Sequence, residues 1–282
     1  MAISPAAVKE LRQKTGAGMM DCKRALVEAG GDALKAEKLL KEMGLAAAAK
    51  RGSRATNEGR VFSHINEKRG ALLELSCETD FVARNDDFVN LGEKMVRMIT
   101  ADGSGVSRAK LEDMVAETAG IIKENMGLKR FETLEGDESA MLVDYIHGEG
   151  RIGVMVRLEL SKPALSENPR VKETAFDFAL HIAAFAPVFL SRQDVSKQYI
   201  AEQEAIFRKQ VEGMDKPANV LDGIVKGKLN KHLAEICLLD QGFVKDEKVK
   251  CSKVLEALGK EVGGKIDIGG YLYFRVGEEL GA

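Results

Sequence analysis

The hydrophobic positions in residues 1–52 follow the spacing of three short helices. Each apolar run is preceded by a residue that commonly starts a helix and is followed by glycine, which is the usual punctuation of helices. The predicted starts are Ser4, Gly18 and Asp32, and the predicted ends are Gly16, Gly30 and Gly44. In the second helix Met19 is expected on the buried face with Cys22, whereas Met20 falls off that face and is expected to be exposed.

From residue 58 onward the pattern changes to an alternation of period two, which is typical of β-strands. Residues 60–65 alternate, and after a polar turn the apolar run of residues 71–77 follows as a second strand, so the two predict a β-hairpin. Two helices are predicted next, the second over residues 107–126 with Ile121 on its buried face.

The same order of hairpin and helix returns in the second half of the chain. Residues 154–160 predict a strand, and Asn168 followed by proline predicts the start of a helix. Residues 69–73 are also similar in sequence to residues 151–155. This repetition predicts an α+β fold with two related core subdomains that contain small antiparallel sheets.

Residues 195–236 show helical spacing on both sides of a break near Pro217. Two arms of about 20 residues predict an antiparallel helical hairpin roughly 30 Å long. Such a hairpin either packs on the core or projects and carries an oligomer or partner contact, and the pattern fits both arrangements.

The predicted domain organisation has three parts. A three-helix domain, residues 1–52, is joined by a linker to about residue 57, whose basic residues are expected to form a solvated hinge. The first core subdomain comprises residues 58–140. The second comprises residues 141–282 and contains the helical hairpin.

Composition narrows the function classes. The 42 basic and 44 acidic residues give a net charge of −2, so no global positive field favours direct nucleic-acid binding. The absence of tryptophan removes a common stacking platform. The N-terminus lacks the pattern of a signal peptide and no run of 18 apolar residues occurs, which excludes a membrane role and predicts a cytoplasmic protein.

The candidate chemistry is sparse, which predicts a protein that is not an enzyme and has no cofactor. The four cysteines lack paired spacing, so neither a disulfide framework nor a zinc site is indicated. The four histidines share no local motif with a nucleophile or a metal ligand. Cys77 beside Glu78 invites a nucleophile hypothesis, but a lone cysteine that ends an apolar strand is more often a core residue.

Residues 77–84 place an acid, Asp80, directly beside a large aromatic, Phe81, where a strand gives way to a helix. Taken alone, this stretch is typical either of a turn with a core anchor or of a tip that enters a partner protein. Val82 and Phe88 are expected to support it from the core. A second candidate contact is the exposed Met20 beside a glycine-rich turn, since flexible methionines suit adaptable protein surfaces.

Three motifs, in their order and spacing, resemble the bacterial translation elongation factor Ts family. They are Leu11-Arg12 with Thr15-Gly16-Ala17-Gly18-Met19-Met20-Asp21-Cys22-Lys23, then Thr79-Asp80-Phe81-Val82-Ala83, then His147-Gly148-Glu149-Gly150-Arg151-Ile152-Gly153-Val154. The resemblance implies a ubiquitin-associated-like three-helix domain, a linker, two related core subdomains and an inserted helical hairpin. It also implies a nucleotide exchange factor for the GTPase elongation factor Tu.

The resemblance places partner contacts on particular residues. Asp80 and Phe81 correspond to the family's wedge, which enters the nucleotide-binding domain of Tu near its magnesium site, and Thr79 and Val82 flank it. The N-terminal contact and the contact toward another domain of Tu then fall on further residues: Lys9, Arg12, Met19, Met20 and Lys23, and His147.

The sequence departs from the family pattern at Ala186 and Gly242, and it stops without the C-terminal helix that some members dock on Tu. The resemblance leaves open a homodimer or a heterotetramer formed through the helical hairpin. The alternative function is a general protein-interaction scaffold built around the ubiquitin-associated-like domain.

Overall fold

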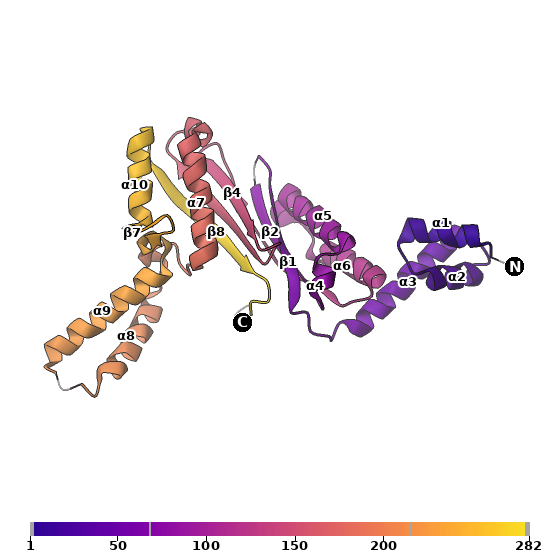
Figure 1. Ribbon diagram of the computed structural model, residues 1–282, viewed down its shortest axis with the longest axis horizontal. Coiled ribbons are helices and arrows are strands. Elements are labelled where there is room, and N and C mark those ends of the chain that lie inside the picture. The colour runs from indigo at the N-terminus through magenta and orange to yellow at the C-terminus, as the bar shows by residue number, and fades with distance from the viewer. Residues whose placement is uncertain (1–2, 68, 215, 280–282) are drawn as a thin grey trace. The chain divides into compact units, whose positions relative to one another are not determined.

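The computed structural model describes residues 3–67, 69–214 and 216–279 and has the predicted α+β architecture (Figure 1). Predictions that rest on residues 1–2, Asp215 or 280–282 lie outside the described residues. The chain divides into two compact units. The first comprises the described residues within Met1–Thr133, Ile146–Gly153 and Phe274–Ala282, and the second comprises those within Leu134–Tyr145 and Val154–Tyr273. The three-part division by residue number stays a prediction.

The three predicted N-terminal helices are present in the first unit. They are α1 (Pro5–Thr15), α2 (Met19–Glu28) and α3 (Ala33–Arg51). The Ser4 hydroxyl accepts a hydrogen bond from the Ala7 N–H, and the Asp32 carboxylate caps α3 in the same way. Their apolar faces form one small core: Val8, Leu11, Cys22, Ala25, Leu26, Ala36 and Leu40.

Two details of this domain were predicted wrongly. The third helix does not end at Gly44 but continues to Arg51, because residues 46–49 are alanines, which favour helix, and α3 is packed against a later helix there. Met19 is not buried with Cys22 but is 50% exposed, since it is the first residue of α2 and lies beyond the bundle core.

The linker's basic residues also differ from the expected solvated hinge. The Arg51 guanidinium donates to the Ala119 carbonyl over 3.0 Å, and the Arg54 guanidinium pairs with Glu78 at 3.3 Å. Both side chains therefore tie residues 51–54 to the core of the first unit.

The rest of the first unit is a three-stranded sheet packed against helices. The sheet has the order β1-β2-β3, and the antiparallel hairpin of β1 and β2 places Phe62 opposite Leu73. Phe88 and Met95 of α5 are fully buried in the core that faces this sheet. The elements are β1 (Glu58–Ile65), β2 (Arg69–Cys77), α4 (Asp80–Ala83), α5 (Asp86–Asp102), the 3₁₀ turn η1 (Gly103–Gly105), α6 (Arg108–Ile122) and β3 (Met126–Glu135).

The helix predicted over residues 107–126 is shorter than expected. α6 ends at Ile122, where Lys123 takes a left-handed conformation with φ of 71°. Met126 already begins β3, a strand that the sequence did not predict because its exposed and half-buried positions show no regular alternation. Ile121, expected to be buried, is 38% exposed.

The second unit repeats the arrangement with a sheet of order β4-β5-β8. Its long helix α7 begins after the Asn168 cap, as predicted, and buries Phe178 and Ile182. The first elements are β4 (Ala140–His147), β5 (Ile152–Leu160), the 3₁₀ turn η2 (Pro163–Glu167) and α7 (Pro169–Phe185). The later elements are η3 (Arg192–Asp194), η4 (Leu238–Asp240), β6 (Gly242–Phe243), β7 (Asp246–Lys250), α10 (Cys251–Val262) and β8 (Ile266–Arg275).

The predicted helical hairpin is formed by α8 (Lys197–Val211) and α9 (Ala218–Ile236). The two helices pack on each other, with Val211, Val225 and Leu233 buried. They extend away from α7 and α10 rather than lying on them (Figure 1). Among the described residues, no helix combines the length and the apolar content that a membrane span requires.

Candidate partner-binding site

An exposed aromatic tip follows strand β2. The Thr79 hydroxyl caps α4 by accepting a hydrogen bond from the Val82 N–H over 3.3 Å. Within this single turn, Phe81 is 81% exposed whereas Val82 is only 6% exposed and packs into the core with Phe88. The predicted supports, Val82 and Phe88, are thereby confirmed as buried, and the buried Val82 directly follows the exposed Phe81.

The base of the tip is bonded to the segment that follows α6. The Thr79 hydroxyl donates to the Glu124 carboxylate over 3.1 Å, and the Asn125 N–H donates to the Glu78 carboxylate over 2.6 Å. The hydrogen bond from Asn125, helped by Arg54, holds the pKa of Glu78 below its ordinary value. These bonds stabilise the conformation in which the tip projects.

A second turn of the first unit lies beside the tip. The Arg84 guanidinium pairs with Glu149 at 3.2 Å and with Asp80 at 3.9 Å, so it bridges the tip and the turn. The Gly150 carbonyl accepts a hydrogen bond from the Val61 N–H over 2.8 Å, which fastens the turn to β1. His147, which is exposed, directly precedes this turn. The structure therefore brings two of the sequence motifs together.

The third motif lies on the N-terminal helices. Met20 is 73% exposed, as predicted, and Met19 is exposed beside it at the start of α2. The three basic residues expected to flank them are also exposed: Lys9, Arg12 and Lys23. Exposed flexible methionines suit an adaptable apolar partner surface, and exposed basic side chains suit an acidic one.

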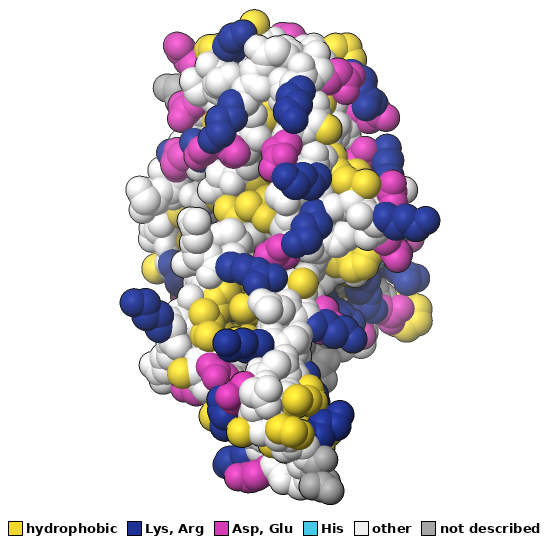
Figure 2. All heavy atoms as spheres, turned by 90° about the vertical axis from the view of Figure 1, so that its left-hand side faces the viewer, with side chains coloured by type: hydrophobic (Ala, Val, Ile, Leu, Met, Phe, Trp, Pro, Cys, Tyr) yellow, Lys and Arg dark blue, Asp and Glu magenta, His cyan; other side chains and the backbone are white. Residues whose placement is uncertain are grey.

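On one face of the molecule, the surface charges are mixed rather than segregated. On the face shown in Figure 2, basic and acidic side chains alternate, and apolar patches lie between them. Such a surface suits contacts with protein better than a field directed at a phosphate backbone.

The nucleophile hypothesis for Cys77 fails on burial. The thiol is fully buried, donates to the Thr79 carbonyl, and has a pKa raised to about 12 by burial. A thiol of that pKa stays protonated at neutral pH and is a poor nucleophile. The other three cysteines, Cys22, Cys237 and Cys251, are also free and buried.

His181 and His232 are bonded to other side chains within the fold. His181 is fully buried, and its Nδ1 accepts from the Val244 N–H while its Nε2 lies 2.9 Å from the Gln241 Oε1. His232 bonds to the Tyr199 hydroxyl over 2.9 Å. Among the described residues, no group of three or more potential ligands is arranged to hold a metal ion.

Comparison with known proteins decides the family. The family model for Elongation factor TS matches residues 78–278, well over half of the chain. The chain belongs to the elongation factor Ts family. The match covers both the Phe81 tip and the His147 turn.

Curated members of the elongation factor Ts family are similar over nearly the whole chain. Elongation factor Ts of Treponema denticola is 45% identical over 279 residues, which are 98% of this chain and 99% of its own. Elongation factor Ts of Borrelia hermsii is 45% identical over 278 residues, 98% of this chain and all of its own. For Borreliella burgdorferi the identity is 44% over 276 residues, 98% of this chain and 99% of its own. Membership of the elongation factor Ts family makes the chain a translation elongation factor.

Sequence analysis did not identify several residues of the site. Arg84 lies within residues 77–84, but the sequence did not indicate its ion-pair partner because Glu149 is distant in the chain. Lys123 and Asn125 follow a helix whose end was predicted four residues too late. Their contacts join elements far apart in sequence, and a single sequence carries no local signal for such pairs.

Proposed function

We propose that this chain is a guanine nucleotide exchange factor that binds the GTPase elongation factor Tu and promotes GDP release during translation elongation. The tip formed by Asp80 and Phe81 enters Tu near its nucleotide and magnesium site. The observation that carries the proposal is the 81% exposure of Phe81 on a turn whose neighbours are anchored in the core. Among the described residues, Phe81 is the most exposed of the large apolar side chains, and the next residue, Val82, fixes its turn to the core.

The magnitudes are compatible with this mechanism. A thousandfold acceleration of GDP release requires about 4 kcal/mol of differential binding, since each tenfold step is about 1.4 kcal/mol. Burying a phenylalanine of about 150–250 Å² is worth roughly 4–6 kcal/mol before entropy costs, at about 25 cal/mol per Å². Phe81 alone is therefore able to supply a large part of the effect. By reciprocity, bound nucleotide weakens the hold of this chain on Tu and lets it dissociate.

The other predicted residues receive distinct roles in the proposal. Asp80 brings a negative charge toward the magnesium site, and Thr79 and Val82 hold the tip. His147 extends the same contact surface from the neighbouring turn. A separate contact, which adds affinity without touching the nucleotide, comes from Lys9, Arg12, Met19, Met20 and Lys23.

The test measures release of a fluorescent GDP from Tu at increasing concentrations of this chain. Phe81→Ala is expected to lower the maximal release rate by 100-fold or more, because each lost 1.4 kcal/mol is a factor of ten. Phe176→Ala, which removes a phenylalanine that is 44% exposed on α7, is the matched control and is expected to leave the rate unchanged.

Two outcomes contradict the proposal. Unchanged GDP release with Phe81→Ala rules out the wedge. Equal affinity of the chain for nucleotide-free and GDP-bound Tu rules out exchange and favours the general interaction scaffold, since an exchange factor must bind the nucleotide-free form more tightly.

A further inference from the structure

The N-terminal three-helix domain is joined to α6 through a contact between two backbones. A Cβ atom built on Gly120 would lie 2.9 Å from the Gly44 Cα, so α3 and α6 touch where both residues are glycine. Glycine within a helix is unfavourable relative to alanine, which makes its use in the last turn of α6 informative. Here it permits an approach that no side chain would allow.

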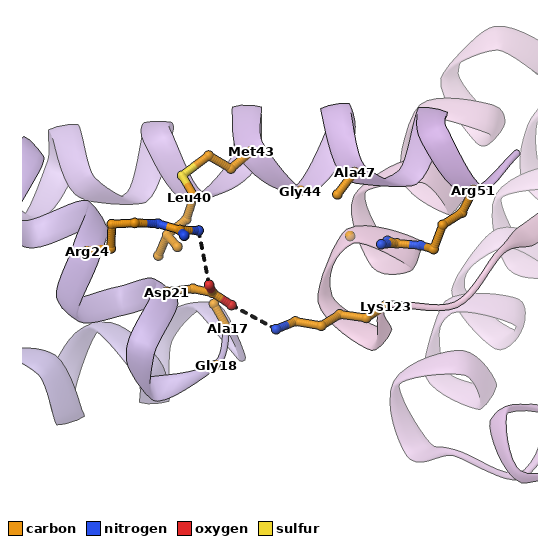
Figure 3. A pocket seen from close by; sticks show the side chains of 11 residues that line it. Ala17, Gly18, Asp21, Arg24, Leu40, Met43, Gly44, Ala47, Arg51 and Lys123 are labelled. Carbon is orange, nitrogen blue, oxygen red and sulfur yellow. Dashed lines mark hydrogen bonds and ion pairs between the residues drawn. The ribbon is translucent and has the colours of Figure 1, made fainter.

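Polar contacts surround this crossing. Lys123 at the end of α6 donates to the Asp21 carboxylate over 2.8 Å, and Lys41 pairs with Glu117 at 2.6 Å. The first of these pairs joins α2 to the end of α6, and Arg24 of α2 pairs with the same Asp21 carboxylate (Figure 3). The hydrogen bond from Lys123 holds the pKa of Asp21 below its ordinary value.

The contact between the N-terminal helices and α6 is called the joint below. The glycine-rich turn that precedes Met19 belongs to it. A Cβ on Gly16 would lie 3.3 Å from the Ile121 side chain, and a Cβ on Gly18 would lie 3.4 Å from the Lys123 ammonium. The turn therefore lies against the end of α6, directly beside the exposed methionines.

The joint is narrow. Cavities of about 210 Å³ and 290 Å³ flank the glycine crossing, while farther along α3 the side chain of Ala48 packs against the core of the first unit. The ion pairs are largely exposed, with Lys123 56% and Lys41 57% accessible, and exposed pairs contribute little to stability. The glycine crossing is thus the point of the joint that tolerates an added side chain least.

The residues that continue from the joint hold the Phe81 tip. Lys123 binds Asp21, Glu124 accepts from Thr79, and Asn125 donates to Glu78. These three consecutive residues therefore bond both to α2, at the residue next to Met20, and to the base of the Phe81 tip. Lys123 has a left-handed backbone conformation, with φ of 71°, at the point where the chain turns from α6 toward the tip. This conformation is disfavoured for a residue with a Cβ.

We propose that residues 123–125 and the Gly44–Gly120 crossing form a shared support that holds the methionine surface and the Phe81 tip in one fixed arrangement. The inference rests on the proposed exchange function. When two contacts are held at the correct separation, the second binds at high effective concentration once the first has formed. Gly120 and Lys123 are thus positioning residues, and they act without touching Tu.

The main test is Gly120→Ala, assayed by GDP release from Tu over a range of concentrations of this chain. The new Cβ forces α3 away from α6, so the half-saturating concentration is expected to rise about tenfold or more while the maximal rate changes less than twofold. Gly223→Ala on α9 is the matched control, because open space surrounds that helical glycine and neither parameter is expected to change.

A second variant separates positioning from stability. Lys123→Gly relieves the left-handed backbone and removes the partner of Asp21, so the melting temperature is expected to stay equal or rise. The half-saturating concentration is nevertheless expected to increase severalfold. A fall in melting temperature that accounts for the lost activity would overturn the positioning role.

A measurement without Tu tests the joint itself. Spin labels at Glu10→Cys and Glu93→Cys are both on exposed positions, and the four native cysteines are buried. The otherwise unaltered chain is expected to show one narrow distance distribution and Gly120→Ala a broad one. A broad distribution without Gly120→Ala overturns the inference.

The outcomes distinguish this inference from the exchange function. If the unaltered chain accelerates GDP release and Gly120→Ala leaves the half-saturating concentration unchanged, the shared support is wrong while the exchange function stands. If the unaltered chain has no effect on GDP release, the exchange function fails, and the spin-label distances alone decide whether the joint is fixed.

Discussion

Each α+β unit contains the same succession of strand, short helical turn and long helix, and the two successions differ at the exposed position of the turn. In each, a nine-residue strand, β2 or β5, leads through a short helical turn to a helix of 17 residues, α5 or α7. When the first residues of these two helices are aligned, the buried Val82 corresponds to the buried Leu165. The residue before the anchor is Phe81 in the first unit and Ala164 in the second, and both are exposed.

This difference separates a residue that the fold requires from a residue that the fold does not require. The turn needs a buried apolar anchor, since both units have one. It does not need a phenylalanine outside that anchor, because the second unit has the same elements with alanine there. The fold therefore does not require a phenylalanine at position 81, which supports the binding role proposed for it.

The largest effect on stability is expected at the anchor. Leu165→Ala is expected to lower the free energy of unfolding by about 2–5 kcal/mol, because it leaves a cavity beneath η2. Urea denaturation measures the change, and Leu34→Ala, at a position 73% exposed, is the control with a change below about 0.5 kcal/mol. GDP release per folded molecule is expected to be unaffected. A loss below 1 kcal/mol for Leu165→Ala would show that the two anchors are not equivalent.

The repeated architecture was predictable because it depends on local patterns. Alternation marked β1, an apolar run marked β2, and an asparagine followed by proline marked the start of α7 at Asn168. Strand β3 was missed because its residues are neither alternating nor strongly apolar, so only pairing with β2 defines it. The end of α3 was missed because packing of Gly44 on α6 outweighs the tendency of glycine to end a helix.

The candidate site was predicted only in part for the same reason. Exposure of Met20 follows from helical periodicity, and the projection of Phe81 follows from the turn after β2. The bonds that connect them pass through Lys123, which lies 102 residues from its partner Asp21. No spacing rule reaches across such a distance.

A smaller effect is expected from a buried histidine that only one unit has. His181 of α7 corresponds to the half-buried Met98 of α5. Burial lowers the pKa of His181, opposed by its hydrogen bond to Gln241. The neighbouring Cys251 thiol, with a pKa raised to about 12 by burial, stays neutral over the same range.

The sign of the pH effect follows from this lowered pKa. The unfolded chain binds a proton at about pH 6.5 while folded His181 does not, so stability is full above that pH and falls as the pH drops below it. The loss approaches about 1.4 kcal/mol per pH unit, and urea denaturation of the second unit between pH 7.5 and 5.5 measures it. The His181→Asn variant is expected to be less stable at every pH. Its free energy of unfolding is expected to lack the pH dependence that His181 contributes. An unchanged slope in that variant would assign the pH dependence to another group.

The smallest effect is expected when the two exposed residues are exchanged for each other. Phe81→Ala gives the first unit the alanine that the second already has, and Ala164→Phe does the reverse. Because both positions are exposed, each change is expected to alter the free energy of unfolding by less than about 0.5 kcal/mol. Ala164→Phe alone is also expected to leave GDP release unaltered, since that turn lacks the threonine cap and the bond to Glu124 that fix Phe81. If Phe81→Ala instead costs more than 1 kcal/mol, Phe81 packs within the fold and its correspondence with Ala164 no longer isolates a binding residue.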